Sequence, residues 1–144
     1  MRTADFYLPS GMPAPVPSVD GLDAQFWAGT RRGKLLFQRC DSCGTLRAPE
    51  WICHRCHSFD ATWCPVTPRG AIYAWERVWH PVMPALIGAC PYLAVVVELV
   101  DAEGLRLVGN LLGDPMQEVR IGACVDAVFE DHDEYTLVQW RVAE

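Results

Sequence analysis

The chain of 144 residues lacks the features that mark membrane and secreted proteins. No run approaches the ~18–20 consecutive apolar residues that a membrane-spanning helix requires. A secretory signal has a basic start followed by an apolar stretch. The opening residues MRTADFYLPSG do not show this pattern. Apolar residues nevertheless make up 51% of the chain, enough for a hydrophobic core. We therefore expect a soluble, cytoplasmic protein.

Familiar catalytic motifs are also missing. The sequence contains no G-x-S-x-G, no H-E-x-x-H and no glycine-rich phosphate loop. His80 precedes a proline at a strand end, His132 lies in an acidic turn that we interpret as solvated, and Cys90 has no base beside it in the sequence. We therefore predict no catalytic residues, and no enzyme activity of the chain on its own.

Positive charge is scarce in the second part of the chain. Residues 1–60 hold seven basic and six acidic side chains, whereas residues 61–144 hold five basic and twelve acidic ones, a net charge of −7. Nucleic-acid-binding proteins usually carry a basic face, because neutralising phosphates supplies most of their non-specific affinity. This charge balance argues against a nucleic-acid partner.

Cysteine, by contrast, is abundant, with seven residues. Four of them form two C-x-x-C pairs, Cys40/Cys43 and Cys53/Cys56, separated by nine residues. Each pair forms a tight knuckle that places two thiolates on one ion, and two knuckles complete a tetrahedral shell without an open position. We predict one structural zinc ion. Iron is the rival because four sulfur ligands suit both metals, and a redox dithiol or simple core thiols are the alternative reading.

The remaining histidines and cysteines of this region receive simpler interpretations. His54 and His57 are read as solvated loop residues, because four cysteines already fill the shell. Gly44 follows the first pair, where a knuckle favours a residue without a Cβ, and His57 takes that place in the second. Cys64, Cys90 and Cys124 are read as free thiols of the core.

The order of the expected elements indicates a mostly β protein. Four prolines in residues 1–19 predict an extended arm, and apolar residues at helical spacing predict a short helix at about residues 21–31. A strand at 35–39 leads into the first knuckle. Five strand-like runs follow the second knuckle and favour a small antiparallel barrel: 70–80, 92–101, 104–112, 125–131 and 135–142.

The segment HPVMPALIGACP, residues 80–91, joins two of these strands and is almost entirely apolar. Loops normally carry polar side chains, so an apolar loop either folds over the barrel or is covered by another protein. If a partner binds there, we expect Met83, Leu86 and Ile87 to be the anchors. A loop packed on its own chain is the alternative.

These motifs together resemble the zinc-ribbon plus OB-fold proteins of the DUF35 type over about residues 22–142. The cysteine pairs alone occur in many folds, whereas their order after a helix and before barrel strands is more specific. The residues that carry the resemblance are Phe26-Trp27, GKLLFQRCDSCG (33–44), Pro49, the second pair, Trp63, Arg69-Gly70, Pro91-Tyr92, VVVEL (95–99), Gly109-Asn110-Leu111 and Val119-Arg-Ile-Gly122. The sequence CHRCH departs from the family, which more often has a proline and a glycine around the second pair.

The resemblance implies a fold of an N-terminal helix, a rubredoxin-like zinc ribbon and a C-terminal five-stranded OB-fold barrel. On this basis we divide the chain into a Pro-rich arm (1–20), a helix (21–33), a zinc ribbon (34–66) and an OB-fold domain (67–144). The family also implies a role as a non-catalytic subunit beside a thiolase-like or lipid-transfer-protein-like aldolase, in the breakdown of steroid or fatty acyl-CoA side chains.

The resemblance suggests three contacts with such a partner in a hetero-oligomer: the arm at 8–17, the helix face of Phe26 and Trp27, and the apolar loop. Arg31, Arg32 and Lys34 form a basic cluster that suits the phosphates of CoA or an acidic partner, with a solvated helix end as the alternative. Two other functions stay open: a free-standing acyl-CoA or lipid binding module, and a single-strand nucleic-acid-binding OB protein.

Overall fold

A computed structural model describes residues 1–3, 5–13 and 16–144 of the chain. These residues form one α-helix, α1 (Ala24–Arg31), one 3₁₀ turn, η1 (Pro84–Leu86), and nine strands. The strands are β1 (Arg2–Thr3), β2 (Leu35–Cys40), β3 (Leu46–Arg47), β4 (Ala61–Val66), β5 (Arg69–Val78), β6 (Tyr92–Leu99), β7 (Arg106–Asn110), β8 (Cys124–Asp131) and β9 (Thr136–Val142). The expected fold class, mostly β with one short helix before the cysteine pairs, is confirmed.

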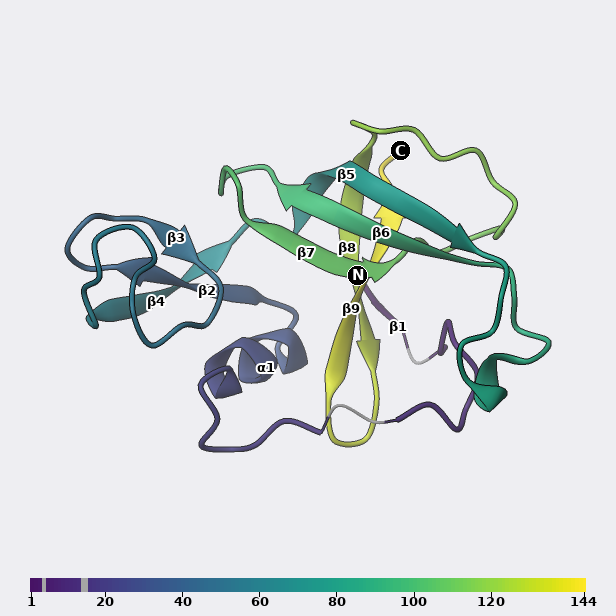
Figure 1. The fold of residues 1–144 in the computed structure, drawn as a ribbon, viewed down its shortest axis with the longest axis horizontal. Coiled ribbons are helices and arrows are strands. Elements are labelled where there is room, and N and C mark those ends of the chain that lie inside the picture. The colour runs from purple at the N-terminus through teal and green to yellow at the C-terminus, as the bar shows by residue number, and fades with distance from the viewer. Residues whose placement is uncertain (4, 14–15) are drawn as a thin grey trace.

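The strands form two sheets, which Figure 1 shows side by side, with α1 below the small sheet and beside the hairpin of β8 and β9. The small antiparallel sheet has the order β3-β2-β4 and carries the cysteine knuckles. The larger sheet has the order β1-β8-β5-β6-β7, and β9 also pairs with β8. Strand β6 shows why these residues form strands, because alternate side chains from Leu93 to Leu99 are buried while those between them are partly exposed.

The larger sheet curls until its last strand meets β7. A parallel bridge joins Leu111 to Trp140, and the Leu112 N–H donates to the Trp140 carbonyl at 2.8 Å. Gly109 permits this approach, because a Cβ at that position would lie 2.5 Å from the carbonyl oxygen of Val138. The five strands β5 to β9 therefore wrap around a common interior, an arrangement compatible with the expected OB barrel.

The hydrophobic core is continuous between the two sheets. Leu35 and Phe37 of β2 belong to the same buried cluster as the barrel residues Val97 and Trp140, and Phe26 of α1 packs against it. The ring of Phe26 lies 5.6 Å from that of Phe37. The ribbon sheet and the barrel thus bury apolar surface against each other.

The N-terminal arm lies partly on the chain's own barrel. Strand β1 pairs in parallel with β8, placing Arg2 opposite Phe129. The Arg2 guanidinium also binds the Asp131 carboxylate, with Nε 2.9 Å from Oδ2. Ala14 and Pro15, in the arm segment expected to meet a partner, lie outside the described residues.

Candidate metal centre

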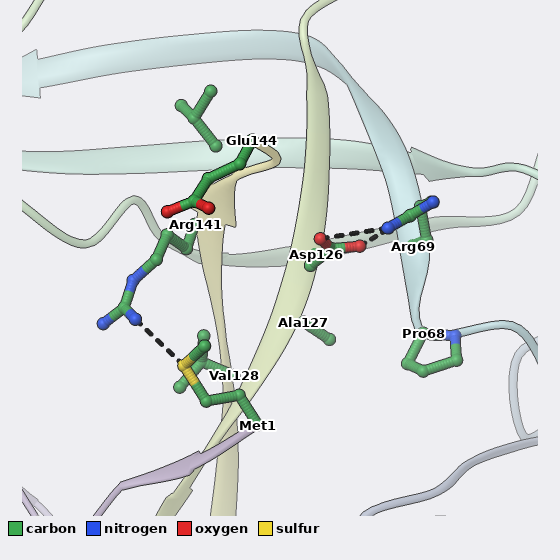
Figure 2. Close-up of a pocket in the computed structure, with 9 residues that line it drawn as sticks. Met1, Pro68, Arg69, Asp126, Ala127, Val128, Arg141 and Glu144 are labelled. Atoms are coloured by element: carbon green, nitrogen blue, oxygen red, sulfur yellow. Dashed lines mark hydrogen bonds and ion pairs between the residues drawn. The ribbon is translucent and has the colours of Figure 1, made fainter.

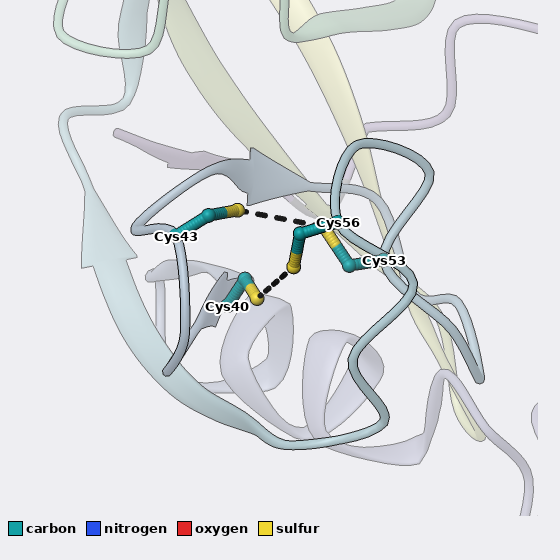
Figure 3. A group of neighbouring side chains, drawn as sticks. All are labelled: Cys40, Cys43, Cys53 and Cys56. Carbon is teal, nitrogen blue, oxygen red and sulfur yellow. Dashed lines mark hydrogen bonds between the residues drawn. The ribbon is translucent and has the colours of Figure 1, made fainter.

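The four cysteines of the two C-x-x-C pairs gather at one end of the ribbon sheet (Figure 3). Their sulfur atoms all lie within 4.8 Å of one another. The Sγ atoms of Cys40 and Cys56 are 3.5 Å apart, and those of Cys43 and Cys53 are 3.7 Å apart. One sulfur from each knuckle thus faces one from the other, which is the geometry that a four-coordinate ion requires.

Backbone hydrogen bonds set the shape of each knuckle. The Gly44 N–H donates to the Cys40 carbonyl, and the His57 N–H donates to the Cys53 carbonyl, each at 2.9 Å. Both donors have left-handed backbone angles, with φ of 74° at Gly44 and 61° at His57. His57, which departs from the family pattern, therefore keeps the knuckle conformation at the cost of a strained residue.

The surroundings of the cluster shift the pKa values of Cys43 and Cys56 in opposite directions. Hydrogen bonds with Thr45, its side chain first and its backbone second, lower the pKa of Cys43 to about 6. The Ser58 backbone lowers the pKa of Cys56, but Cys40, desolvation and the sulfurs of Cys43 and Cys53 together outweigh it and raise that pKa to about 12. Four sulfurs this close favour a cation among them, so the cluster is suited to a structural metal ion.

Acidification should release this metal. Thiolates are the ligands, so protons compete with the ion, and the competition strengthens as the pH falls through the pKa of Cys43, which is about 6. We expect metal retention at neutral pH and progressive loss as the pH is lowered, measured by dialysis at a series of pH values followed by elemental analysis. Metal content that stays constant down to pH 4 in protein that can still be refolded would contradict thiolate ligation.

The other histidines and cysteines lie outside the cluster. His54 and His57 are exposed, and His54 Nδ1 lies 3.4 Å from a carboxylate oxygen of Glu50. Cys64 and Cys90 are partly exposed and Cys124 is exposed, so the prediction that these three are buried core thiols is wrong. Cys64 lies within β4, Cys90 in the loop before β6, and Cys124 is the first residue of β8.

The predicted partner residues of α1 are half-buried. Phe26 contacts the core. The Trp27 ring packs edge-on against the Phe26 ring, with the two ring centroids 5.4 Å apart. Trp27 Nε1 donates to Asp23 Oδ2 at 2.8 Å, within its own helix. Both side chains border a cavity of about 340 Å³ against β7 and β9, so part of each ring faces open space.

The apolar loop after β5 divides into buried and exposed residues. Leu86, in η1, is only 1% exposed, so this chain itself covers it and the prediction that it anchors a partner is wrong. Ile87 is 73% exposed and Met83 is half-buried. Trp79 and Val82 of the same loop, which were not among the predicted anchors, are 61% and 75% exposed.

The basic cluster near α1 also divides. The Arg31 guanidinium donates to the carbonyls of His132, Asp133 and Tyr135, so it holds the β8–β9 turn and is not free for a phosphate. Arg32 and Lys34 are exposed, and no side-chain hydrogen bond or ion pair involves them within the described residues.

His132 is the residue whose role the sequence concealed. It is not a solvated turn residue, because its ring stacks between Phe6 at 4.1 Å and Tyr135 at 4.5 Å. Its Nε2 lies 2.8 Å from the carboxylate of Glu130, which is 2% exposed and also accepts from the Tyr7 N–H. The stack fastens the arm to the barrel. Nothing in the sequence pairs residue 6 with residue 132.

A cavity of about 550 Å³ is lined by residues of the barrel and by Met1, and none of the four clustered cysteines lines it (Figure 2). Arg69 and Asp126 face each other across its wall, with Nε 2.6 Å from Oδ1, and Arg141 reaches the sulfur of Met1. This ion pair raises the pKa of Arg69 and lowers that of Asp126. The lining contains no histidine or cysteine among the described residues, and we assign no chemistry to it.

No helix in the described part of the chain is long and apolar enough to span a bilayer.

The fold and the cysteine cluster define a protein with a ribbon-type metal centre joined to an OB-fold barrel. Two family models match the chain: the rubredoxin-like zinc ribbon domain of ChsH2 over residues 27–61, and the C-terminal OB-fold domain of ChsH2 over residues 63–130. The chain is also 32% identical to a solved chain of the "Ltp2-ChsH2(DUF35) aldolase", covering 99% of that chain and 89% of this one with a TM-score of 0.76. It belongs to the DUF35 family of zinc-ribbon plus OB-fold proteins, as the resemblance indicated.

Curated relatives extend the comparison. The chain is 34% identical over 90% of its length to the "Probable enoyl-CoA hydratase alpha subunit" of Thermomonospora curvata, and 28% identical over 96% of its length to the 3-oxo-4,17-pregnadiene-20-carboxyl-CoA hydratase alpha subunit of Mycobacterium tuberculosis. It spans only 40% and 47% of those proteins. A DUF35 domain-containing scaffold protein of Methanocaldococcus jannaschii is 30% identical, and the match covers 69% of this chain and 73% of that protein.

Proposed function

We propose that the chain is a non-catalytic subunit of an acyl-CoA-processing complex and supports a thiolase-like or lipid-transfer-protein-like aldolase partner. The observation that carries the proposal is the match over almost the whole length of the DUF35 chain of the Ltp2-ChsH2 aldolase. A relative described as a scaffold and two described as alpha subunits of CoA-thioester hydratases agree with a supporting role. The steroid thioester in the name of one relative favours a steroid acyl-CoA as the substrate of the complex.

The metal in this proposal is zinc, held by Cys40, Cys43, Cys53 and Cys56. Four sulfurs leave no open position for water or substrate, so the ion stabilises the ribbon and does not catalyse a reaction. The matching zinc ribbon family model favours zinc over iron. The seven cysteines, all within the described residues, form no disulfide, which fits a cytoplasmic protein, where thiols stay reduced.

The proposed division of labour follows the parts of the chain. We retain the arm (1–20), helix (21–33), ribbon (34–66) and OB-fold domain (67–144) as working boundaries. The exposed loop residues Trp79, Val82 and Ile87 are proposed to meet the partner, together with the open side of Phe26 and Trp27. Exposed apolar side chains grouped in one loop are typical of a surface that another protein covers.

Co-expression with a lipid-transfer-protein-like thiolase or aldolase from the same host tests the proposal. We expect the two chains to elute together from a sizing column with light scattering, and the isolated chain to show no turnover of acyl-CoA. Aldolase or thiolase activity should belong to the complex. Separate elution of two well-folded proteins would remove the subunit role and leave a free-standing binding module.

A further inference from the structure

Arg47 is a buried cation whose guanidinium is only partly satisfied. The residue is 1% exposed, and its Nε donates to Gln38 Oε1 at 3.0 Å. Nη1 and Nη2 have no hydrogen-bond partner among the described residues. A buried charge ordinarily has an opposite charge beside it, because taking an ion out of water is costly. No carboxylate of the described residues bonds to Arg47, so its charge must be compensated by another group.

The position of Arg47 is fixed by the ribbon sheet. Arg47 of β3 lies opposite Gln38 of β2, and Gln38 is two residues from Cys40 on the same strand. Side chains two residues apart point to the same face about 7 Å from each other. The Glu50 N–H, ahead of the second knuckle, also donates to Gln38 Oε1 at 3.1 Å. Arg47 therefore lies inside the ribbon, on the face of β2 that carries Cys40.

Negative charge inside the ribbon comes from the cysteine cluster. Four thiolates around a divalent ion carry a net charge of −2. Glu130 is the other buried charged residue of the described chain, and it lies in the barrel, bound by His132 and Gln139. Of these two anionic groups, the metal centre is the one that shares the ribbon sheet with Arg47.

We infer that Arg47 is the buried counter-charge of the metal centre and strengthens the binding of a divalent ion to the four thiolates. The inference rests on the metal site of the proposed function. Charges in a protein interior are screened far less than exposed ones, so a buried cation on the ribbon face that carries Cys40 affects the centre more than an arginine at the surface. Arg55 offers the comparison, because it lies between Cys53 and Cys56 and is exposed.

Zinc affinity gives the first test, measured by chelator competition on the full chain. We expect Arg47→Met to weaken zinc binding by about tenfold, and Arg55→Met by less than about threefold. If wild-type protein binds no metal, the metal site itself fails. If metal binds but the two variants change affinity equally, or not at all, the metal site stands and the inference about Arg47 is overturned.

The iron-loaded protein gives a second readout that packing alone would not move. One-electron reduction of the ferric ion by an external reductant takes the centre from −1 to −2, and a nearby buried cation favours the more negative state. Arg47→Met should lower the reduction potential by about 59 mV, the value of a tenfold change for one electron. Arg55→Met should shift it by less than half of that.

Arg47→Lys separates charge from packing. Lysine keeps the positive charge but loses the planar donor that meets Gln38. We expect this variant to unfold at a lower temperature than wild type yet keep the wild-type iron potential. If the reduction potential of Arg47→Lys falls by as much as is expected for Arg47→Met, then Arg47 acts through packing and not through its charge. This comparison decides the matter even if Arg47→Met does not fold.

Discussion

Replacing Cys40 by serine is expected to release the metal ion and unfold the ribbon. Its sulfur is one of the four in the cluster, and the sheet around it is small, with β3 only two residues long. Such a unit has little core of its own, and structural zinc supplies on the order of 10–16 kcal/mol of apparent binding free energy in comparable sites. Elemental analysis should show loss of zinc, and thermal unfolding should show a large drop in midpoint.

Cys124→Ser is the matched control for this experiment, because Cys124 is exposed and lies outside the cluster. We expect it to keep one zinc ion per chain and a midpoint close to that of wild type. Two results would contradict the prediction: folded wild-type protein without zinc or iron, or a Cys40→Ser variant as stable as wild type in the presence of a chelator.

Aspartate at Trp79 and Ile87 together is expected to abolish the complex with the partner enzyme. A few apolar anchors in desolvated pockets supply most of the energy of an interface, and each such anchor contributes about 2 kcal/mol or more. Burying two carboxylates in the same pockets adds a desolvation penalty. Titration calorimetry of the double variant with the partner should show at least a hundredfold loss of affinity, while circular dichroism of the free variant stays unchanged.

Two further variants make this result specific. Val100→Asp places a carboxylate on a side chain that is 56% exposed in the turn after β6, and it should leave the affinity unchanged. Leu86→Ala removes a buried side chain of the same loop, so it should lower the stability of the free chain by about 2–5 kcal/mol. Unchanged affinity of the double variant would move the docking surface to another part of the molecule.

Features coded within short segments of the sequence were predictable. The spacing of Cys40, Cys43, Cys53 and Cys56 gave the cluster, because a knuckle is a local structure closed by hydrogen bonds between near neighbours. The five barrel strands lie within two residues of their predicted ends, because alternating apolar side chains and turn residues mark them locally.

Features that depend on contacts between distant residues were not predictable. The pairing of β1 with β8 joins residues more than a hundred positions apart, and the stack of Phe6 on His132 follows from it. The local sequence indicated that Arg31 belongs to a basic cluster with Arg32 and Lys34. In the fold, its guanidinium donates to carbonyls of the turn between β8 and β9. The apolar composition of residues 80–91 indicated that the barrel or a partner would cover some of their side chains. Only the fold shows that Leu86 is buried and Ile87 is exposed.

The continuous core has a consequence for protein engineering. Leu35 and Phe37 of the ribbon sheet are packed among the barrel residues, so the two parts are not interchangeable cassettes. A chimaera that joins the ribbon of one relative to the barrel of another would place unmatched side chains in the shared core between the ribbon sheet and the barrel. Chimaeras that transfer β2 together with the barrel residues that it contacts should fold. Chimaeras divided after β4 should fold only with compensating substitutions in the shared core.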